Sequence, residues 1–340
     1  MTKKIDIAIV GATGAVGEVM LEILEEVNFP CDKVYLLASE RSKGKRLQFR
    51  NTSLMVEDLS KFDFSKVQVA LFSAGGKISE EYVPKATAKG AVVIDNTSQF
   101  RYDPLVPLVI PEVNPHKIAD YKNKLIIANP NCSTIQMLVA LKPIYDAVGI
   151  SRINIATYQS VSGTGKEAIK ELAGQTAILL NGQTIKPNVY PVQIAFNVIP
   201  HIDDFLENGY TREEMKMVWE TQKIFEDDNI RVNPTAVRVP VFYGHSEAIH
   251  IETNAKITAE QARALLAKAP GVKLKDQQKA KHYPSPVVDA VGKDAVWVGR
   301  IREDISHSNG LNLWVVSDNI RKGAALNSIQ IAEILVRDYL

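Results

Sequence analysis

The sequence predicts two domains: an α/β domain built on a parallel sheet, then an α+β domain on a mixed or antiparallel sheet. Short aliphatic runs alternate with helical patterns as far as about residue 130, whereas later strands alternate apolar and polar side chains. The length, 340 residues, also exceeds that of a typical single domain. We therefore expect a first domain over 1–133, a second over 134–316, and a C-terminal segment, 317–340, that completes the first.

Composition and charge narrow the classes of function. Hydrophobic residues make up 46% of the chain and charged residues 23%, as in soluble globular proteins. The formal net charge of +1 predicts neither a nucleic-acid partner nor attraction to a membrane surface. No apolar run approaches the roughly 20 residues that span a bilayer, and a strand near the N-terminus leaves no room for a signal peptide. The two cysteines make no disulfide framework, so we expect a cytoplasmic protein.

The first domain alternates strands and helices. Its strands are aliphatic on both faces, as in a buried parallel sheet, and are expected at 5–10, 34–37, 67–72, 92–94 and 125–128. Helical patterns at 18–27 and 79–89 lie between them. This alternation predicts a doubly wound sheet with right-handed crossovers.

The second domain combines longer strands with capped helices. Strands are expected at 153–157, 237–241, 249–251, 296–301 and 311–316. A threonine followed three residues later by Glu or Gln, a capping box, opens helices at Thr211 and Thr258, and Gly271 ends the second of them. A last helix at 322–339 is expected to pack on the first domain.

A glycine-rich turn after the first strand predicts a dinucleotide site. The strand Ile5–Val10 leads into Gly-Ala-Thr-Gly-Ala-Val-Gly, with glycines at Gly11, Gly14 and Gly17. Glycines allow a tight turn and the approach of a pyrophosphate, which the helix N-terminus stabilises, as in Rossmann-type domains. The alternative is an ordinary glycine turn, but the flanking strand and helix favour the dinucleotide site.

The end of the second strand distinguishes the two nicotinamide cofactors. Arg41 can pair with a 2′-phosphate and Ser42 can donate to it, whereas Glu40 would repel that phosphate if it pointed inward. We therefore predict NADP(H) as the cofactor. No spacing of His, Cys and Asp predicts a metal site.

Cys132 lies in Asn-Pro-Asn-Cys-Ser-Thr at 129–134, between a short aliphatic strand and a helical pattern over 133–147. A thiol at a helix N-terminus is favoured as the thiolate, and a strand-to-helix turn is where open α/β sheets bind ligands. The alternative is a buried structural cysteine. Asn131, beside the thiol, could donate to a developing oxyanion or cap the helix.

Five segments resemble the aspartate-semialdehyde dehydrogenase family. They are those at 11–17, 38–42 and 129–134, Tyr-Gln-Ser-Val-Ser-Gly at 158–163 and Arg-Val-Pro-Val-Phe-Tyr-Gly-His-Ser-Glu at 238–247. The resemblance spans nearly the whole chain and implies reduction of L-aspartyl-4-phosphate by NADPH to L-aspartate 4-semialdehyde and phosphate. It implies a role in lysine, diaminopimelate, threonine and methionine biosynthesis, a second domain that is catalytic and mediates dimerisation, and a homodimer or homotetramer.

The resemblance also implies residue roles. Cys132 looks like the nucleophile that forms an acyl thioester, and His245 looks like the proton-transfer residue. Gln159 and Arg238 look like substrate ligands, and Glu213 looks like the ligand of the substrate amino group. The phosphate ligands would be Arg101 and Lys216, and the cofactor contacts would be Thr13, Gly14, Ala15, Val16, Arg41, Ser42, Ser162, Gly163 and Asn319.

Several of these residues also make chemical sense by themselves. A guanidinium such as Arg238 pairs with a substrate carboxylate, and we expect it to point away from the apolar core because Val237 and Val239 face the other way. The alternative for Arg238 is an arginine exposed on the surface, and the alternative for His245 is a histidine in a loop. For Glu213 and Lys216, the alternative is a solvated salt bridge. 

Two other functions stay open. N-acetyl-gamma-glutamyl-phosphate reductase has a similar fold and chemistry, but its acylated substrate amine gives an acidic partner such as Glu213 no purpose. A non-catalytic NADP-binding sensor would be expected to lack the thiol or the histidine, and both are present.

Overall fold

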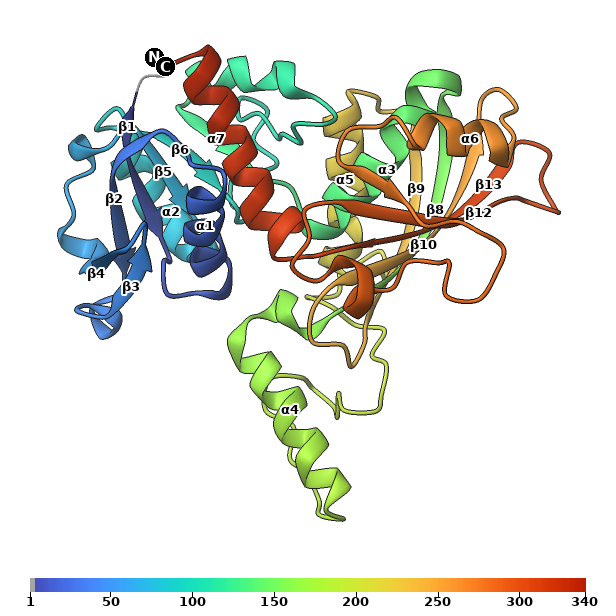
Figure 1. Ribbon diagram of the computed structural model, residues 1–340, viewed down its shortest axis with the longest axis horizontal. Helices are drawn as coiled ribbons and strands as arrows, with labels where there is room; N and C mark the ends of the chain where they lie inside the picture. The colour runs from blue at the N-terminus through green and yellow to red at the C-terminus, as the bar shows by residue number, and fades with distance from the viewer. Residues whose placement is uncertain (1–3) are drawn as a thin grey trace. The chain divides into compact units, whose positions relative to one another are not determined.

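The computed structural model describes residues 4–340 and divides the chain into two compact units (Figure 1). The first unit ends at Asn131 and is completed by Ala324–Leu340. The second unit is Cys132–Gly323. Residues 317–323, which we expected with the C-terminal segment, therefore belong to the second unit.

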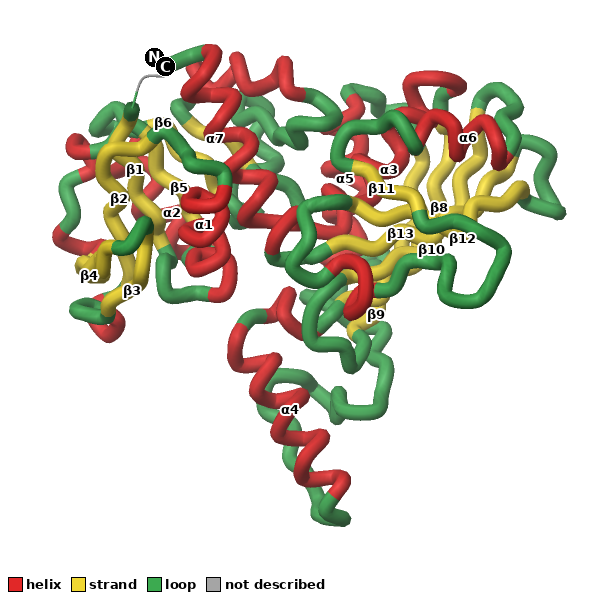
Figure 2. Tube along the Cα trace, in the orientation of Figure 1, coloured by secondary structure: helices red, strands yellow, loops and turns green. Residues whose placement is uncertain are grey.

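The first unit holds a seven-stranded sheet in the order β3-β4-β2-β1-β5-β6-β7 (Figure 2). The strands are β1 (Ile5–Val10), β2 (Cys31–Ala38), β3 (Arg46–Phe49), β4 (Thr52–Asp58), β5 (Val69–Phe72), β6 (Val92–Asp95) and β7 (Ile126–Ala128). Every neighbouring pair is parallel except β3 with β4. The helices are α1 (Ala15–Glu26), α2 (Gly76–Thr87) and α7 (Leu326–Asp338). The predicted dinucleotide-binding fold is confirmed.

The hairpin β3–β4 was not predicted. Its first strand, Arg-Leu-Gln-Phe, alternates polar and apolar side chains over only four residues, a short signal that sequence reasoning missed. Arg50 and Asn51 join the two strands with φ of 45° and 62°, a left-handed turn without a glycine to signal it.

The second unit is built on a six-stranded mixed sheet in the order β11-β12-β13-β10-β8-β9. The strands are β8 (Ile150–Gln159), β9 (Arg231–Arg238), β10 (His245–Thr253), β11 (Val272–Leu274), β12 (Val296–Glu303) and β13 (Gly310–Ser317). The pairs β8–β9 and β11–β12 are parallel and the others antiparallel, so the predicted mixed sheet is confirmed. The short β11 was not predicted.

Helices cover one face of this sheet: α3 (Cys132–Val148), α5 (Arg212–Phe225) and α6 (Ala259–Leu266). The other face carries Tyr158 and Trp314, whose rings stand 5.6 Å apart, and a cavity of about 430 Å³ beside Ala248. The helix α4 (Lys166–Leu180) extends away from the sheet as an arm (Figure 1). A small core that includes Leu172, Ile194 and Ile199 holds the arm together.

Both predicted capping boxes are confirmed. In α5 the Thr211 hydroxyl accepts from the Glu214 amide at 3.3 Å, and the Glu214 carboxylate accepts from the Thr211 amide at 2.7 Å. The same reciprocal bonds join Thr258 and Gln261 at the start of α6. These bonds satisfy N–H groups that a helix start leaves without partners.

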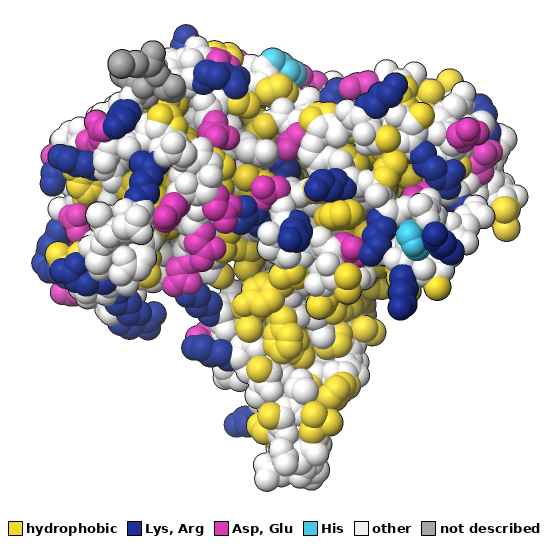
Figure 3. All heavy atoms as spheres, in the orientation of Figure 1, with side chains coloured by type: hydrophobic (Ala, Val, Ile, Leu, Met, Phe, Trp, Pro, Cys, Tyr) yellow, Lys and Arg dark blue, Asp and Glu magenta, His cyan; other side chains and the backbone are white. Residues whose placement is uncertain are grey.

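Lys, Arg, Asp and Glu side chains are interspersed over the face seen in Figure 3, in keeping with a net charge near zero. Within residues 4–340, no helix combines the length and the apolar character needed to cross a bilayer.

Candidate active site

One row of buried side chains crosses four strands of the second unit. His245 pairs with Ser317 on β13, Gln159 pairs with Arg238 on β9, and the register of β8 with β10 places Gln159 beside His245. Paired residues point to the same face of a sheet. The exposed fractions are 0% for His245, 2% for Gln159 and 4% for Arg238. The row therefore lies under the helices that cover this face.

Arg238 corrects one expectation. It lies on the same side of β9 as Pro234 and Ala236, which are buried, whereas Val237 is only half-buried on the open side. Because Val237 and Val239 were taken as the residues that face the core, the buried face of this strand was assigned to the wrong side. The guanidinium Nη1 donates to the Ser160 carbonyl at 2.7 Å, and Nε is buried with no hydrogen-bond partner. An arginine placed in this way is poised for an anionic ligand.

His245 is completely buried, and its two ring nitrogens differ. Nδ1 lies 3.1 Å from both the amide nitrogen and the hydroxyl of Ser160, whereas Nε2 has no hydrogen-bond partner. Burial, and then the positive charge of Arg238, lower the pKa of His245 to about 3, although Glu213 opposes this. The ring is therefore neutral at physiological pH. The alternative of a surface loop histidine is wrong.

Glu213 and Lys216 lie on α5 and join this row. The Lys216 ammonium is 2.9 Å from Glu213 and 2.8 Å from Asp203, and Gln159 donates to Glu213 at 3.3 Å. Their side chains are only 8% and 13% exposed, so this is not a solvated salt bridge. Burial alone would lower the pKa of Lys216, but the two carboxylates outweigh it and raise that pKa. Lys216 therefore stays charged.

Cys132 is the first residue of α3, half-buried and not in a disulfide. A Cβ added to Gly323 would come within 2.7 Å of the Cys132 Cβ, so the turn at 318–323 packs directly against the thiol residue. Only glycine fits at position 323. The turn also carries Asn319.

Asn319, Ser162 and Ser160 form a buried hydrogen-bonded cluster. The Asn319 oxygen accepts from the hydroxyls of Ser160 at 3.0 Å and Ser162 at 3.1 Å. A Cβ on Gly163 would lie 3.3 Å from an Arg238 nitrogen and 3.4 Å from the His245 ring, so the backbone comes close to both groups. Sequence reasoning missed Ser160, whose position between Gln159 and Ser162 was the available signal. Contacts of Ser162, Gly163 and Asn319 with a cofactor stay a prediction.

The glycine turn of the first unit has the shape of a pyrophosphate cradle. Gly11 has φ of +90°, and a Cβ there would lie 2.9 Å from the Ser73 backbone. A Cβ on Gly17 would lie 2.3 Å from the Gly11 oxygen. The turn therefore needs glycine, and it leads into α1, whose N-terminal N–H groups suit a pyrophosphate. The residues present fit a dinucleotide.

The predicted 2′-phosphate residues lie in a short 3₁₀ turn, Glu40–Ser42, after β2. Arg41 and Glu40 are exposed, and Ser42 is 8% exposed with its hydroxyl 3.5 Å from that of Thr13. Glu40 is therefore not held pointing inward by burial. This leaves room for Arg41 to meet a phosphate.

Arg101 and Asn131 lie at the carboxyl ends of β6 and β7 in the first unit. Arg101 is 6% exposed and donates to the carbonyls of Asn129 and Asn96, both at 2.8 Å. Asn131 is 7% exposed. The roles predicted for these two residues, phosphate ligand and oxyanion donor, stay predictions.

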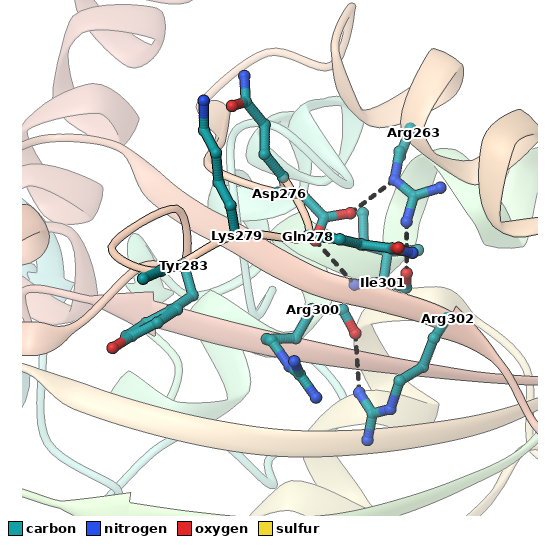
Figure 4. A pocket seen from close by; sticks show the side chains of 10 residues that line it. Arg263, Asp276, Gln278, Lys279, Tyr283, Arg300, Ile301 and Arg302 are labelled. Carbon is teal, nitrogen blue, oxygen red and sulfur yellow. Dashed lines mark hydrogen bonds and ion pairs between the residues drawn. The ribbon is translucent and has the colours of Figure 1, made fainter.

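A separate cavity of about 490 Å³ lies in the second unit beside β12 (Figure 4). Arg263 binds Asp276 at 2.6 Å there, and Arg300 and Arg302 line its floor. None of the predicted site residues lines it, so we do not assign the reaction to this cavity. Among residues 4–340, no group of His, Cys, Asp and Glu could hold a metal ion.

Comparisons with known proteins match both parts of the chain to one family. Residues 6–121 match the semialdehyde dehydrogenase NAD binding domain, and residues 141–322 match the semialdehyde dehydrogenase dimerisation domain. Aspartate-semialdehyde dehydrogenase of Shewanella violacea is 65% identical over 339 residues, covering 100% of both chains. That of Bacillus subtilis is 51% identical over 343 residues, covering 98% of each. The crystal structure of aspartate semialdehyde dehydrogenase II from Vibrio cholerae, complexed with ASA, matches with a TM-score of 0.98 and 62% identity over 100% of both chains.

Proposed function

This chain belongs to the aspartate-semialdehyde dehydrogenase family of oxidoreductases, and we propose that it reduces L-aspartyl-4-phosphate to L-aspartate 4-semialdehyde with NADPH. One observation carries the proposal: Gln159, His245 and Arg238 form a buried row on the sheet face that α3 covers, and α3 begins at Cys132, which is not in a disulfide. That set supplies a nucleophile, a hydrogen-bonding imidazole and a carboxylate clamp.

The reaction runs through a thioester on Cys132. The thiolate attacks the acyl carbon, the bond to the phosphate oxygen breaks, and inorganic phosphate leaves. Bound NADPH supplies a hydride to the thioester carbon. The carbonyl oxygen then takes the negative charge, and the C–S bond breaks to release the aldehyde and regenerate the thiolate. The start of α3 stabilises the thiolate before it attacks the acyl carbon and again after the C–S bond breaks.

The substrate is oriented by the charged groups of the second unit. Arg238 holds the α-carboxylate through its unpartnered side, and Glu213 holds the α-ammonium group. A buried carboxylate at this place argues against the alternative function, N-acetyl-gamma-glutamyl-phosphate reductase, because an acylated substrate amine carries no positive charge to offset that of Glu213. Arg101 and Lys216 bind the phosphate group, and Asn131 donates to the developing oxyanion.

NADP(H) is preferred over NAD(H) because Arg41 and Ser42 follow β2, where the adenosine ribose lies in dinucleotide domains. Thr13, Gly14, Ala15 and Val16 would contact the pyrophosphate from the turn before α1 and from the first residues of that helix. Ser162, Gly163 and Asn319 are proposed to contact the nicotinamide half. A non-catalytic sensor would need the cofactor site but not the buried row.

The active form is a homodimer, which could pair further into a homotetramer. Large apolar side chains on the segment that returns from α4 are exposed: Val192 47%, Phe196 64%, Val198 60% and Phe205 62%. Hydrophobic side chains are prominent on this arm in Figure 3. Apolar surface of this kind marks a protein interface, and a second copy of the chain is the partner that the matched dimerisation domain favours.

The protein is proposed to act in the cytoplasm, where its two cysteines, neither of which is in a disulfide, stay reduced. Its product would feed the biosynthesis of lysine, through diaminopimelate, and of threonine and methionine.

The test is phosphate-dependent reduction of NADP⁺, measured as the absorbance of NADPH at 340 nm, with aspartate semialdehyde and N-acetylglutamate semialdehyde offered as substrates in separate assays. Only the first should be oxidised. Cys132→Ser should lose nearly all turnover while it binds NADPH with unchanged affinity, because a serine hydroxyl is far less ionised than a thiol at a helix start. A Cys132→Ser enzyme with more than a small fraction of the wild-type kcat would remove Cys132 from the nucleophile role.

A further inference from the structure

We propose that Asn327 and Ser328, at the start of the C-terminal helix α7, are positioning residues for Arg101. In this role they act through the two backbone segments whose carbonyls orient the Arg101 guanidinium, and not by contact with the phosphate group. The inference rests on the proposed role of Arg101 as a phosphate ligand. The contacts that carry it all lie within the first unit.

Two backbone carbonyls fix the plane of the Arg101 guanidinium. Nε donates to the Asn129 carbonyl and Nη2 donates to the Asn96 carbonyl, both at 2.8 Å. Arg101 is 6% exposed, so water competes little for these bonds. Because the guanidinium is a rigid planar fork, two bonds to separate acceptors determine where its remaining nitrogen points. The orientation of Arg101 therefore depends on the segments that carry the two carbonyls.

Asn327 holds the first of these segments. Its Nδ2 donates to the Asn129 side-chain oxygen at 2.7 Å and to the Val109 carbonyl at 3.0 Å. A carbonyl can only accept, so the bond to Val109 settles which end of the Asn327 amide is the nitrogen. Asn327 is 0% exposed and Asn129 is 1% exposed. The Asn129 side chain is thus held by a buried donor from α7, while its backbone nitrogen donates to the Asp95 carbonyl at 2.8 Å.

Ser328 holds the second segment. Its hydroxyl donates to the Asn96 side-chain oxygen at 3.0 Å. The Asn96 Nδ2 donates to the Phe72 carbonyl at 3.1 Å, and the Asn96 backbone nitrogen donates to the same carbonyl at 2.9 Å. Asn96 is therefore tied to β5 by two bonds and to α7 by a third. The carbonyl that accepts from Arg101 Nη2 belongs to this same residue.

The two segments lie at the edge of the sheet where ligands are expected. Asn96 follows β6 and Asn129 follows β7, and these strands are parallel neighbours. The carboxyl ends of parallel strands meet at one edge, which is where open α/β sheets bind ligands. The alternative is that the bonds from α7 only stabilise the first unit. A purely structural role would change the free energy of unfolding without acting on phosphate in particular.

The test is steady-state kinetics in the oxidising direction, with inorganic phosphate varied at saturating aspartate semialdehyde and NADP⁺. Asn327→Ala should raise the KM for phosphate by about fivefold or more, while the KM for aspartate semialdehyde changes by less than about twofold. Ser328→Ala, which loosens only the Asn96 segment, should raise the KM for phosphate by a smaller factor. Thermal unfolding and NADPH affinity show that each variant is folded. A folded variant with the wild-type KM for phosphate would overturn the role of the residue that it replaces.

Gln330 provides a matched control on the same helix. Its Nε2 donates to the Glu112 carboxylate at 3.4 Å, and Glu112 lies outside the two segments that hold Arg101. Gln330→Ala removes an amide from α7, so the KM for phosphate should stay within about twofold of the wild-type value. A rise as large as that in Asn327→Ala would mean that any change in α7 disturbs phosphate binding, and the positioning role would be overturned.

Combination with Arg101→Ala shows whether the effect passes through Arg101. By itself, Arg101→Ala should raise the KM for phosphate by more than either variant in α7. Adding Asn327→Ala should then cause no further rise, because the side chain that Asn327 positions is absent. An equal rise in both backgrounds would show that Asn327 acts by another route and would overturn the proposal. If Arg101→Ala leaves the KM for phosphate unchanged, the proposed phosphate role of Arg101 is itself wrong, and the inference falls with it.

Discussion

We propose two tasks for Arg238, which use different atoms of its guanidinium group. Nη1 donates to the Ser160 carbonyl, and Nε, which has no protein partner, would bind the substrate carboxylate. Lysine has one nitrogen and cannot perform both tasks. The substrate clamp and the support of the His245 environment therefore depend on the planar guanidinium.

Arg238→Lys should lower kcat/KM for aspartate semialdehyde by more than about tenfold despite the conserved charge. With a semialdehyde that lacks the α-carboxylate, the loss should be smaller but not absent, because the Ser160 contact is lost for every substrate. NADPH affinity is the control and should barely change. The same factor of loss on both substrates would mean that Arg238 does not bind the carboxylate.

Glu247 lies two residues after His245 on β10, on the same face, and is 0% exposed. Both of its carboxyl oxygens lack a hydrogen-bond partner. Burial raises the pKa of Glu247 well above its ordinary value, and the nearby Gln136 amide opposes this only in part. The folded protein therefore keeps this carboxyl protonated.

The protonated Glu247 makes stability depend on pH. Below the unfolded-state pKa, both states hold the proton and no penalty arises. As pH rises above it, only the unfolded state ionises, so the wild type loses up to about 1.4 kcal/mol per pH unit until the folded-state pKa is reached. Glu247→Gln removes this loss, so its advantage in urea unfolding should be larger at pH 7.5 than at pH 4.5. An equal difference at both pH values would show an ionised Glu247 in the folded protein.

Among the elements, those with a strong local signal were predictable. Residues 5–10 predicted β1, and the capping boxes predicted the first residues of α5 and α6. The glycine turn predicted a following helix, but α1 begins at Ala15 and not at 18 as expected. The hairpin β3–β4 was missed because its alternation is short, and the helix α4 was missed because its exposed residues carry weak periodicity. The cluster of Ser160 with Asn319 could not be predicted, because 159 positions separate the two residues in the chain.

Two helical glycines give a matched test of packing. A Cβ on Gly17 in α1 would lie 2.3 Å from the Gly11 oxygen, whereas Gly174 in α4 has nothing within 4 Å. Gly17→Ala should lower the free energy of unfolding by about 1–3 kcal/mol and weaken NADPH binding, because the strand-to-helix turn must shift. Gly174→Ala should raise it by about 0.5–1 kcal/mol. Urea unfolding of both variants checks this, and a stable, cofactor-competent Gly17→Ala would contradict the close approach.

Across the whole chain, the first and last residues of the second unit lie side by side. Cys132 is the first residue after one crossing and Gly323 is the last before the other, and the two residues are in contact. The proposed nucleophile therefore lies where the chain enters the second unit. The sequence motif around Cys132 could be recognised, but this meeting with a turn almost 190 positions later follows only from the fold.

The proposed dimer can be tested at Phe196, which is strained as well as exposed. Its φ is +60° and it is 64% exposed, so an isolated chain gains little from an aromatic residue there. Asparagine adopts this backbone conformation more readily, so Phe196→Asn should keep the arm folded while it removes apolar contact surface. We expect the variant to dissociate at protein concentrations where the wild type stays dimeric in analytical ultracentrifugation, while its thermal unfolding stays unchanged.

Met55 on β4 is 54% exposed and lies in the first unit, outside the matched dimerisation domain, so Met55→Asn is the control and should not change the association. If Phe196→Asn dimerises as tightly as the wild type, the arm does not contribute to the interface, and the open face with Tyr158 and Trp314 becomes the surface to test.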